Sequence, residues 1–154
     1  MTASAPIVTI IVPGRDIAPF APAALASLQA QTEPRWRAIL VDDGSSDDTG
    51  RIFADAADSD PRFTVISHEA SRGLGAARNV ALDRVDTALL GFLDADDELT
   101  PTALARLTGT LARTGSCALL CVIEVPSART RQRTTTSGMT SKARARVYIS
   151  CATI

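Results

Sequence analysis

Two apolar runs in this 154-residue chain each end abruptly in carboxylates. Residues 38–41 run directly into the acidic pair at 42–43, and residues 88–93 run into the D-A-D-D cluster at 94–97. Short, unbroken apolar runs of this kind are typical of strands that are buried on both faces of a parallel sheet. Because the carboxyl ends of neighbouring parallel strands meet at one edge, we expect the two acidic groups to lie close together.

The rest of the first 115 residues alternates between apolar runs and segments of helical periodicity. Strands are expected at 7–12, 36–41, 63–67 and 88–93, with a fifth at 118–125, and helices at 22–31, 49–57, 74–85 and 100–115. This alternation predicts an α/β fold with a parallel sheet and right-handed crossovers. In the Rossmann-like order 3-2-1-4, the first strand lies between the second and the fourth.

Charge is distributed unevenly along the chain. The net charge is −1, which gives no indication of a nucleic-acid partner. Residues 1–112 carry nine basic and sixteen acidic side chains, whereas residues 113–154 carry seven basic side chains and one acid, Glu124. We therefore divide the chain into a domain at 6–115 and an atypical basic tail at 116–154, which is expected to be flexible, a short appended segment or a truncation product.

Three cysteines, Cys117, Cys121 and Cys151, form neither an even set nor a metal-binding spacing, which indicates a reducing compartment. No basic segment precedes the first apolar run, and the longest apolar runs have the length of strands. These features predict a cytoplasmic protein and leave open a peripheral contact with the inner face of the plasma membrane.

The cluster of Asp94, Asp96 and Asp97 brings like charges together, and these repel one another unless protons or a cation neutralise them. Mg²⁺ or Mn²⁺ commonly takes one or two protein carboxylates and completes its shell with phosphate and water. The alternative is a solvated acidic turn that caps the following helix. The earlier pair, Asp42 and Asp43, offers a similar choice between an Asx-turn that starts a helix and a hydrogen-bond acceptor for a base or a ribose.

The segment Gly73–Asn79 opens a helix, where free N–H groups attract anions and Arg78 adds a planar cation. It can also be interpreted as a flexible helix entry with Arg78 on the solvated face. A dinucleotide fingerprint is a weaker interpretation, because Arg78 takes the place of the third glycine. His68 is expected in a surface loop without a catalytic role. Arg15 and Asp16 either flank a base or belong to a solvated loop.

Five segments together resemble the nucleotide-sugar-binding half of family 2 glycosyltransferases, which have the GT-A fold. These segments are Ile10–Pro13, Ser27–Thr32, Ile39–Thr49, Gly73–Asn79 and Phe92–Asp97. Each segment alone is a weak signal, but five in the family's order and spacing are specific, and they cover residues 6–115. The fold class predicted is thus a Rossmann-like GT-A three-layer sandwich that is apparently truncated.

The resemblance implies inverting transfer from a nucleoside-diphosphate sugar, most often a UDP-sugar, with Mg²⁺ or Mn²⁺ and with an unknown glycan or lipid as acceptor. The donor-binding residues it implies are Pro13, Arg15, Asp43, Arg78 and Asp94, with Asp96 as the metal ligand. In this scheme Asp43 contacts the base and Arg78 helps to hold the nucleotide. Asp94 lies near the ribose and diphosphate, and Asp96 is the principal metal ligand.

The chain departs from the family pattern at two places. The family often has an aromatic or small residue and then Asn after the first strand's proline, whereas this chain has Gly14-Arg15-Asp16. After Glu98 the only acid is Glu124, so no residue matches the later carboxylate that serves as the catalytic base. The alternative function is therefore a truncated, catalytically inactive donor-binding fragment. A phosphoacceptor receiver domain is a third hypothesis, but its acidic pair would follow the first strand, and Lys142 is wrongly spaced.

Overall fold

The computed structural model describes residues 5–114, 118–123 and 145–151. The strands are β1 (Val8–Gly14), β2 (Trp36–Asp42), β3 (Phe63–Ser67), β4 (Leu89–Phe92), β5 (Ala118–Ile123) and β6 (Ala145–Cys151). The helices are α1 (Ala21–Gln29), α2 (Thr49–Ser59), α3 (Leu74–Leu82) and α4 (Ala103–Thr114). The six strands form one sheet in the order β3-β2-β1-β4-β6-β5.

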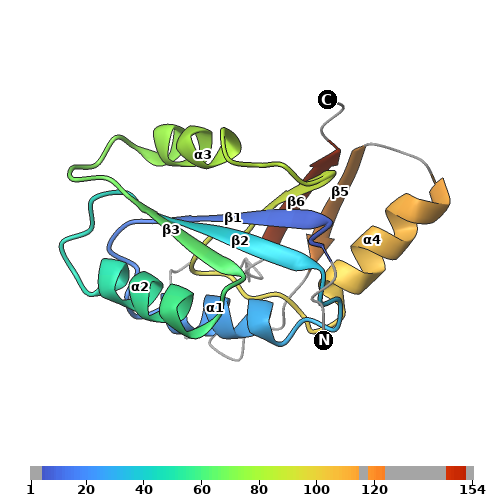
Figure 1. Cartoon of the computed structure of the whole chain (residues 1–154), viewed down its shortest axis with the longest axis horizontal. Coiled ribbons are helices and arrows are strands. Elements are labelled where there is room, and N and C mark those ends of the chain that lie inside the picture. Colours follow the sequence, from blue (N-terminus) through green and yellow to red (C-terminus); the bar gives the residue numbers. More distant parts are fainter. Residues whose placement is uncertain (1–4, 115–117, 124–144, 152–154) are drawn as a thin grey trace, which may run out of the picture.

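The first four strands are parallel, and β1 lies between β2 and β4. In this register Ile11 aligns with Ile39 on one side and with Phe92 on the other. The predicted order 3-2-1-4 is therefore confirmed. Since all four strands run in the same direction, their carboxyl ends meet at one end of the molecule (Figure 1).

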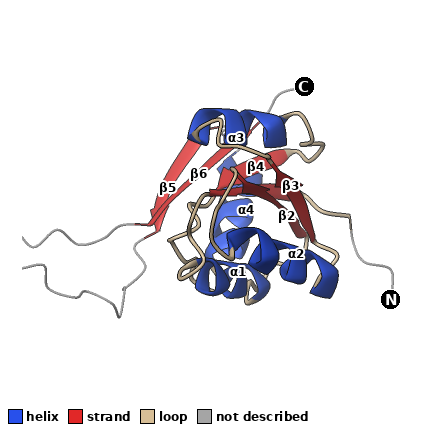
Figure 2. Cartoon of the chain, turned by 90° about the vertical axis from the view of Figure 1, so that its left-hand side faces the viewer, coloured by secondary structure: helices blue, strands red, loops and turns tan. Residues whose placement is uncertain are grey.

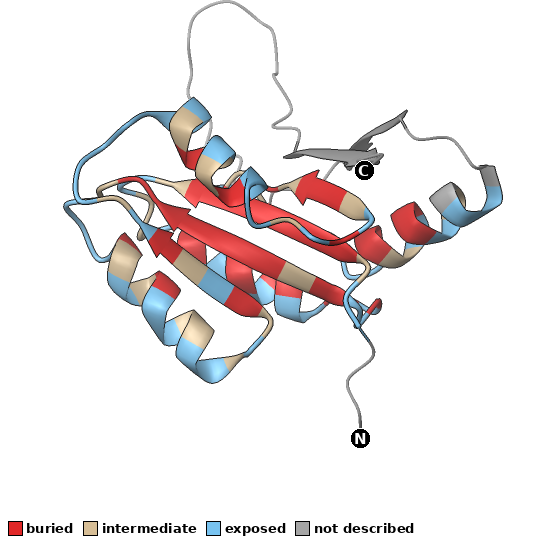
Figure 3. Cartoon of the chain, turned by 45° about the horizontal axis from the view of Figure 1, so that its top comes forward, coloured by how far each residue is buried: buried red, intermediate tan, exposed pale blue. Residues whose placement is uncertain are grey.

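Helices cover both faces of the sheet, with α3 on one face and α1, α2 and α4 on the other (Figure 1). Alternating side chains of β1 divide between two cores: Val8, Ile10 and Val12 pack with α1, α2 and α4, and Ile11 packs with α3. The central strands β1 and β2 are buried along almost their whole length (Figure 3). Their largely apolar sequences, interrupted by Thr9 in β1 and by Arg37 in β2, follow from this coverage.

The sheet becomes mixed beyond β4. The expected fifth strand is present as β5, but it does not pair with β4; β6 lies between them and is antiparallel to both (Figure 2). Residues 145–151 were expected to belong to a flexible or appended tail and instead form a strand of the main sheet. Residues 124–144 of that tail, with Glu124 and Lys142, lie outside the described residues. The domain division at residue 115 remains a prediction.

In the described part of the chain, no helix combines the length and the apolar character needed to cross a membrane. The expected cytoplasmic location, with or without a peripheral membrane contact, stays a prediction.

The last described helix begins later than predicted. Residues 100–102 form a turn, in which Ala103 N donates to Thr100 O at 2.9 Å, and α4 starts at Ala103. The Thr100 carbonyl also accepts from the Gln31 side chain at 2.8 Å, and the Pro101 carbonyl accepts from Thr32 N at 2.8 Å. These contacts with the segment after α1 hold the turn in place and delay the helix.

Gln31 is buried and uses its whole amide group. Nε2 donates to Ser27 O at 2.9 Å and to Thr100 O, while Oε1 accepts from Leu104 N at 3.0 Å. Ser27 adds to the same junction, because its hydroxyl accepts from Leu99 N at 3.0 Å. This part of the Ser27–Thr32 segment thus anchors residues 99–104, which follow directly on the acidic turn at 94–97.

We expect Gln31→Glu to lower the free energy of unfolding by roughly 2–4 kcal/mol, because the carboxylate faces two carbonyl oxygens and loses both donated bonds. Urea denaturation followed by circular dichroism measures this change. The matched control is Gln29→Glu on the exposed end of α1, which should cost less than about 1 kcal/mol. Equal losses in the two variants would contradict the anchoring role.

Candidate functional site

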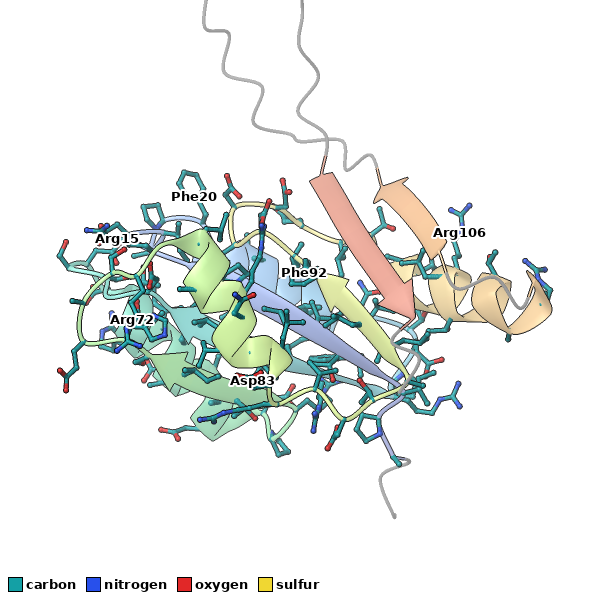
Figure 4. The ribbon with its side chains drawn as sticks, turned by 90° about the horizontal axis from the view of Figure 1, so that it is seen from above. Arg15, Phe20, Arg72, Asp83, Phe92 and Arg106 are labelled. Carbon is teal, nitrogen blue, oxygen red and sulfur yellow. The ribbon has the colours of Figure 1, made fainter. Side chains whose placement is uncertain are left out.

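The end of β1 and the end of β2 are joined at the carboxyl edge of the sheet. Gly14 aligns with Asp42 in the β1–β2 register, and the next residue, Asp43, donates its backbone N–H to Gly14 O at 3.0 Å. Figure 4 shows Arg15 and Arg72 at this end of the molecule, with Asp83 toward the other end of α3. Loops following three different strands therefore converge here.

Asp43 is the centre of this convergence. One carboxylate oxygen, Oδ1, accepts from His68 Nδ1 at 2.7 Å and from Arg72 N at 2.9 Å. The other, Oδ2, accepts from Ser71 Oγ at 2.7 Å and from Gly73 N at 2.9 Å. A carboxylate has about four lone-pair sites, so these four donors occupy all of its accepting capacity.

Two opposing effects act on the pKa of Asp43. Its side chain is only 6% exposed, and this burial raises the pKa of the carboxyl group. The hydrogen bonds from Arg72 N, His68, Ser71 and Gly73 N outweigh burial and hold the pKa well below its usual range. Asp43 is therefore a stable anion, and its hydrogen bonds hold residues 68–73 at the end of β2.

His68 does not lie in a solvated surface loop as predicted. Its side chain is 8% exposed, and Nδ1 contacts Asp43. Because an ionised carboxylate only accepts hydrogen bonds, Nδ1 is the donor. The strand register contains the signal that sequence reasoning missed: Asp42 pairs with Ser67, so the next residues, Asp43 and His68, are also neighbours.

Asp42 accepts a hydrogen bond within its own turn, whereas Asp43 accepts hydrogen bonds from the loop before α3. Asp42 Oδ1 accepts from Ser45 N at 3.0 Å and so caps the turn through Gly44 and Ser45. This bond goes three residues along the chain and is not the predicted Asx-turn, in which the acceptor bonds the second residue along. Gly44, which lies between Asp43 and Ser45 in the chain, has φ +68°, and a Cβ there would lie 2.6 Å from Ser71 N. Glycine is required at this position because the two loops approach too closely for any side chain.

Asp16 links the loop after β1 to the loop after β2. Its carboxylate Oδ1 accepts from Ser46 N at 2.7 Å and from Ser46 Oγ at 3.0 Å, and its own N–H donates to Ser45 Oγ at 3.0 Å. Asp16 has φ +52°, in the left-handed region that non-glycine residues seldom adopt. We call Asp16, Ser45 and Ser46 the loop clasp.

Two further hydrogen bonds extend the loop clasp toward α2. Ile17 N donates to Thr49 Oγ1 at 2.9 Å, and Ala18 N donates to Asp47 Oδ2 at 3.0 Å. The other oxygen of Asp47 accepts from Thr49 N at 2.9 Å, within the first turn of α2. The β1–α1 loop is therefore held in place by the side chains of Asp47 and Thr49, just before and at the start of α2.

A cavity of about 250 Å³ opens between these loops and α3. Its lining residues are Pro13, Gly14, Arg15, Asp43, Ser71, Gly73, Leu74 and Ala77. Three of the predicted donor-binding residues, Pro13, Arg15 and Asp43, therefore line one cavity. Ser71, Leu74 and Ala77 are lining residues that the sequence analysis did not assign.

Arg78 and Asp94 form a second group beside the end of β4. Arg78 Nη2 donates to Asp94 Oδ1 at 2.9 Å, and the guanidinium carbon lies 5.5 Å from the centre of the Phe92 ring. The Nε of Arg78 is buried and has no hydrogen-bond partner among the described residues. The α3 cation and the β4 carboxylate are thus brought together, but neither belongs to the lining of the cavity.

Asp96 is exposed in the turn after β4, and its carboxylate has no hydrogen bond or ion pair within the described residues. No group of three or more acidic, histidine or cysteine side chains within those residues could hold a metal ion by itself. One free carboxylate does fit an ion that takes most of its ligands from a diphosphate and water. The acidic turn does not cap a helix directly, since α4 begins only at Ala103.

Comparison with known proteins identifies the fold and the family. Residues 9–150 match Glycosyl transferase family 2, and the chain belongs to this family. Its fold is the GT-A fold, a Rossmann-like α/β three-layer sandwich with a mostly parallel sheet. The chain is 40% identical over 103 residues to the uncharacterized glycosyltransferase EpsJ of Bacillus subtilis (strain 168), a match that covers 67% of this chain and 30% of EpsJ.

Two solved structures with bound nucleotides are similar. S. aureus TarS 1–349 in complex with UDP has a TM-score of 0.71 and 26% identity, over 81% of this chain and 38% of that solved chain. The mannosyltransferase PcManGT from Pyrobaculum calidifontis, in complex with GDP-Man and Mn²⁺, has a TM-score of 0.69 and 28% identity, over 80% and 37% of the two chains. The chain spans about a third of the length of curated relatives such as EpsJ and less than a sixth of longer ones.

We expect Asp43→Asn to lower the free energy of unfolding by roughly 2–4 kcal/mol, because the amide offers one accepting oxygen and turns an NH₂ group toward two of the four donors. Urea denaturation measures the loss. Asp55→Asn, on the exposed face of α2, is the matched control and should change stability by less than about 0.5 kcal/mol. An Asp43→Asn protein as stable as this control would refute the anchoring role.

The lowered pKa of Asp43 also predicts a pH dependence. A carboxyl group whose pKa is lower in the folded than in the unfolded state stabilises the fold fully above the unfolded value of about 3.9, and the stabilisation is lost as pH falls below it. We expect the stability difference between wild type and Asp43→Asn to shrink as pH falls from about 5 to below about 4. Urea titrations at each pH check this, and a difference that grows on acidification would contradict it.

Proposed function

We propose that this chain binds a nucleoside-diphosphate sugar at the carboxyl ends of β1, β2 and β4 and presents it for glycosyl transfer. The observation that carries the proposal is the cavity lined by Pro13, Arg15 and Asp43 in a chain of Glycosyl transferase family 2. The similar proteins TarS and PcManGT were solved with UDP and with GDP-Man, which supports a nucleotide at this place.

The proposed donor is a UDP-sugar that extends from the cavity toward the end of β4. Its base enters the cavity beside Asp43, where a hydrogen bond to the carboxylate requires one of the four present donors to share or give up its position. Its ribose and diphosphate reach Asp94 and Arg78. The partial exposure of the two side chains, 33% for Arg78 and 44% for Asp94, supports this, because a diphosphate can reach them from the solvent side.

Mg²⁺ or Mn²⁺ is the proposed cofactor, with Asp96 as its protein ligand and diphosphate oxygens among its other ligands. When bound, the ion neutralises the charge that develops on the departing diphosphate. The exposed and uncommitted carboxylate of Asp96 and the Mn²⁺ in the PcManGT complex support this assignment. Asp94 is less suited to the role of principal ligand because Arg78 already neutralises it.

The proposed reaction is inverting transfer to a glycan or lipid acceptor. Inverting displacement requires a base that removes the acceptor's proton. Residues 99–154 contain a single acid, Glu124, so these residues by themselves assign no such base. The second candidate function, for this stretch of sequence taken alone, is donor binding without turnover. The names of similar proteins, such as the succinoglycan biosynthesis protein ExoU of Rhizobium meliloti (strain 1021), support a role in polysaccharide or cell-wall synthesis.

We expect the chain to bind a UDP-sugar in isothermal titration calorimetry with Mn²⁺ or Mg²⁺, and more weakly, by about tenfold or more, with EDTA. Asp96→Ala should bind equally weakly with and without metal, because the ion's protein ligand is lost. Asp55→Ala, on the exposed face of α2, is the control and should keep the full metal dependence. Equal affinity of the wild-type chain with metal and with chelator would refute the metal assignment.

A further inference from the structure

We propose that Ser27 in α1 positions the acidic turn after β4, and that its hydroxyl thereby determines how tightly the metal ion is held at Asp96. This inference rests on the proposed metal-dependent binding of the donor. Ser27 belongs to a family-like segment, Ser27–Thr32, that contributes neither to the cavity lining nor to the Arg78–Asp94 pair. It is a positioning residue, because it acts on Asp96 through the backbone and does not contact the ion.

The position of Asp96 depends on its backbone alone. Its exposed carboxylate has no hydrogen bond or ion pair within the described residues, so no contact of the side chain orients it. Within the turn, Asp97 N donates to Asp94 O at 2.9 Å, which shapes the turn but does not fix it to the rest of the protein. The contacts at the two ends of residues 93–99 therefore determine where Asp96 lies.

The end of this segment next to β4 is anchored to β1. Leu93 is fully buried, and its N–H donates to Ile11 O at 3.0 Å. Ala95 is also buried and lies beside the end of β1, where a Cβ added to Gly14 would lie 3.4 Å from the Ala95 Cβ. The sheet therefore fixes the backbone up to the residue that precedes Asp96.

The other end is anchored to α1 by the Ser27 hydroxyl. Leu99 is buried, and its N–H, three residues after Asp96, donates to Ser27 Oγ at 3.0 Å. The same hydroxyl donates to Ala24 O at 2.7 Å, so it acts as donor and acceptor at once. Ser27 is the only polar residue among the five buried residues of α1. The contact with Leu99 accounts for a polar group on this otherwise apolar helix face.

Removing the hydroxyl releases this end of the turn. Alanine at position 27 leaves Leu99 N without its acceptor, whereas the bonds from residues 31 and 32 to the carbonyls at 100 and 101 remain. The backbone between Asp96 and Leu99 then has more conformations, and only a fraction of the molecules holds Asp96 where the ion requires it. The apparent metal affinity falls by that fraction, which for one hydrogen bond is about fivefold.

The test measures the affinity of the full chain for UDP by isothermal titration calorimetry, with Mn²⁺ and with EDTA. We expect Ser27→Ala to lower the gain from Mn²⁺ by about fivefold and to leave the affinity in EDTA as in wild type. Ser27→Thr keeps the hydroxyl and should restore most of the gain. Thr108→Val is the control: it removes an equally buried hydroxyl whose bonds stay within α4, and it should bind UDP like wild type in both conditions.

Amide hydrogen exchange tests the same contact without a ligand. In Ser27→Ala, exchange should accelerate at residues 96–100, and most of all at Leu99, while β1 and β2 exchange as in wild type. Residues 96–100 should exchange at the wild-type rate in Thr108→Val. Unchanged exchange at these residues in Ser27→Ala would show that the hydroxyl does not hold the turn.

The outcomes distinguish this inference from the proposed function. A wild-type chain that does not bind UDP, or binds it equally with Mn²⁺ and with EDTA, refutes the proposed metal-dependent function and this inference with it. A gain from Mn²⁺ that persists in full in Ser27→Ala refutes the inference alone. Equal losses with Mn²⁺ and with EDTA also refute it, because they indicate a general structural role, and so does a Ser27→Thr protein that shows no recovery.

Discussion

The carboxylate of Asp43 is the contact on which the arrangement of the site depends. It stands at the end of a central strand and satisfies two side chains and two backbone N–H groups from the loop before α3. Without it, Arg72 N and Gly73 N would need other acceptors, and the start of α3 would have no fixed distance from β2. The cavity exists because one buried anion determines the position of a whole loop.

The fold could be predicted from sequence because the central strands are covered on both faces. Largely apolar sequences in β1 and β2 identify buried parallel strands, and abrupt carboxylates mark the ends of the runs in β2 and β4. The position of β6 could not be predicted in this way. Inserting 145–151 between β4 and β5 is a long-range pairing, and the local pattern of residues 145–151 does not specify a partner.

In the site, too, some features could be predicted from the sequence and others could not. The positions of Asp43 and Asp94 followed from the rule that acids after parallel strands share an edge. The burial of His68 did not, because its loop position suggested solvent and only the β2–β3 register brings it beside Asp43. The left-handed backbone of Asp16 could not be predicted either, because it depends on hydrogen bonds with two serines about thirty residues away. Local composition says little about contacts that cross between loops.

The loop clasp has a consequence for engineering and for divergence within the fold. The backbone around Arg15 is held by hydroxyl and amide groups of residues 45–46, so the two loops form one structural unit although they are separate in sequence. Grafting residues 14–18 alone into another member of the family would therefore transfer the side chains without their geometry. Transferring the geometry of this site by exchange of segments requires moving both loops together.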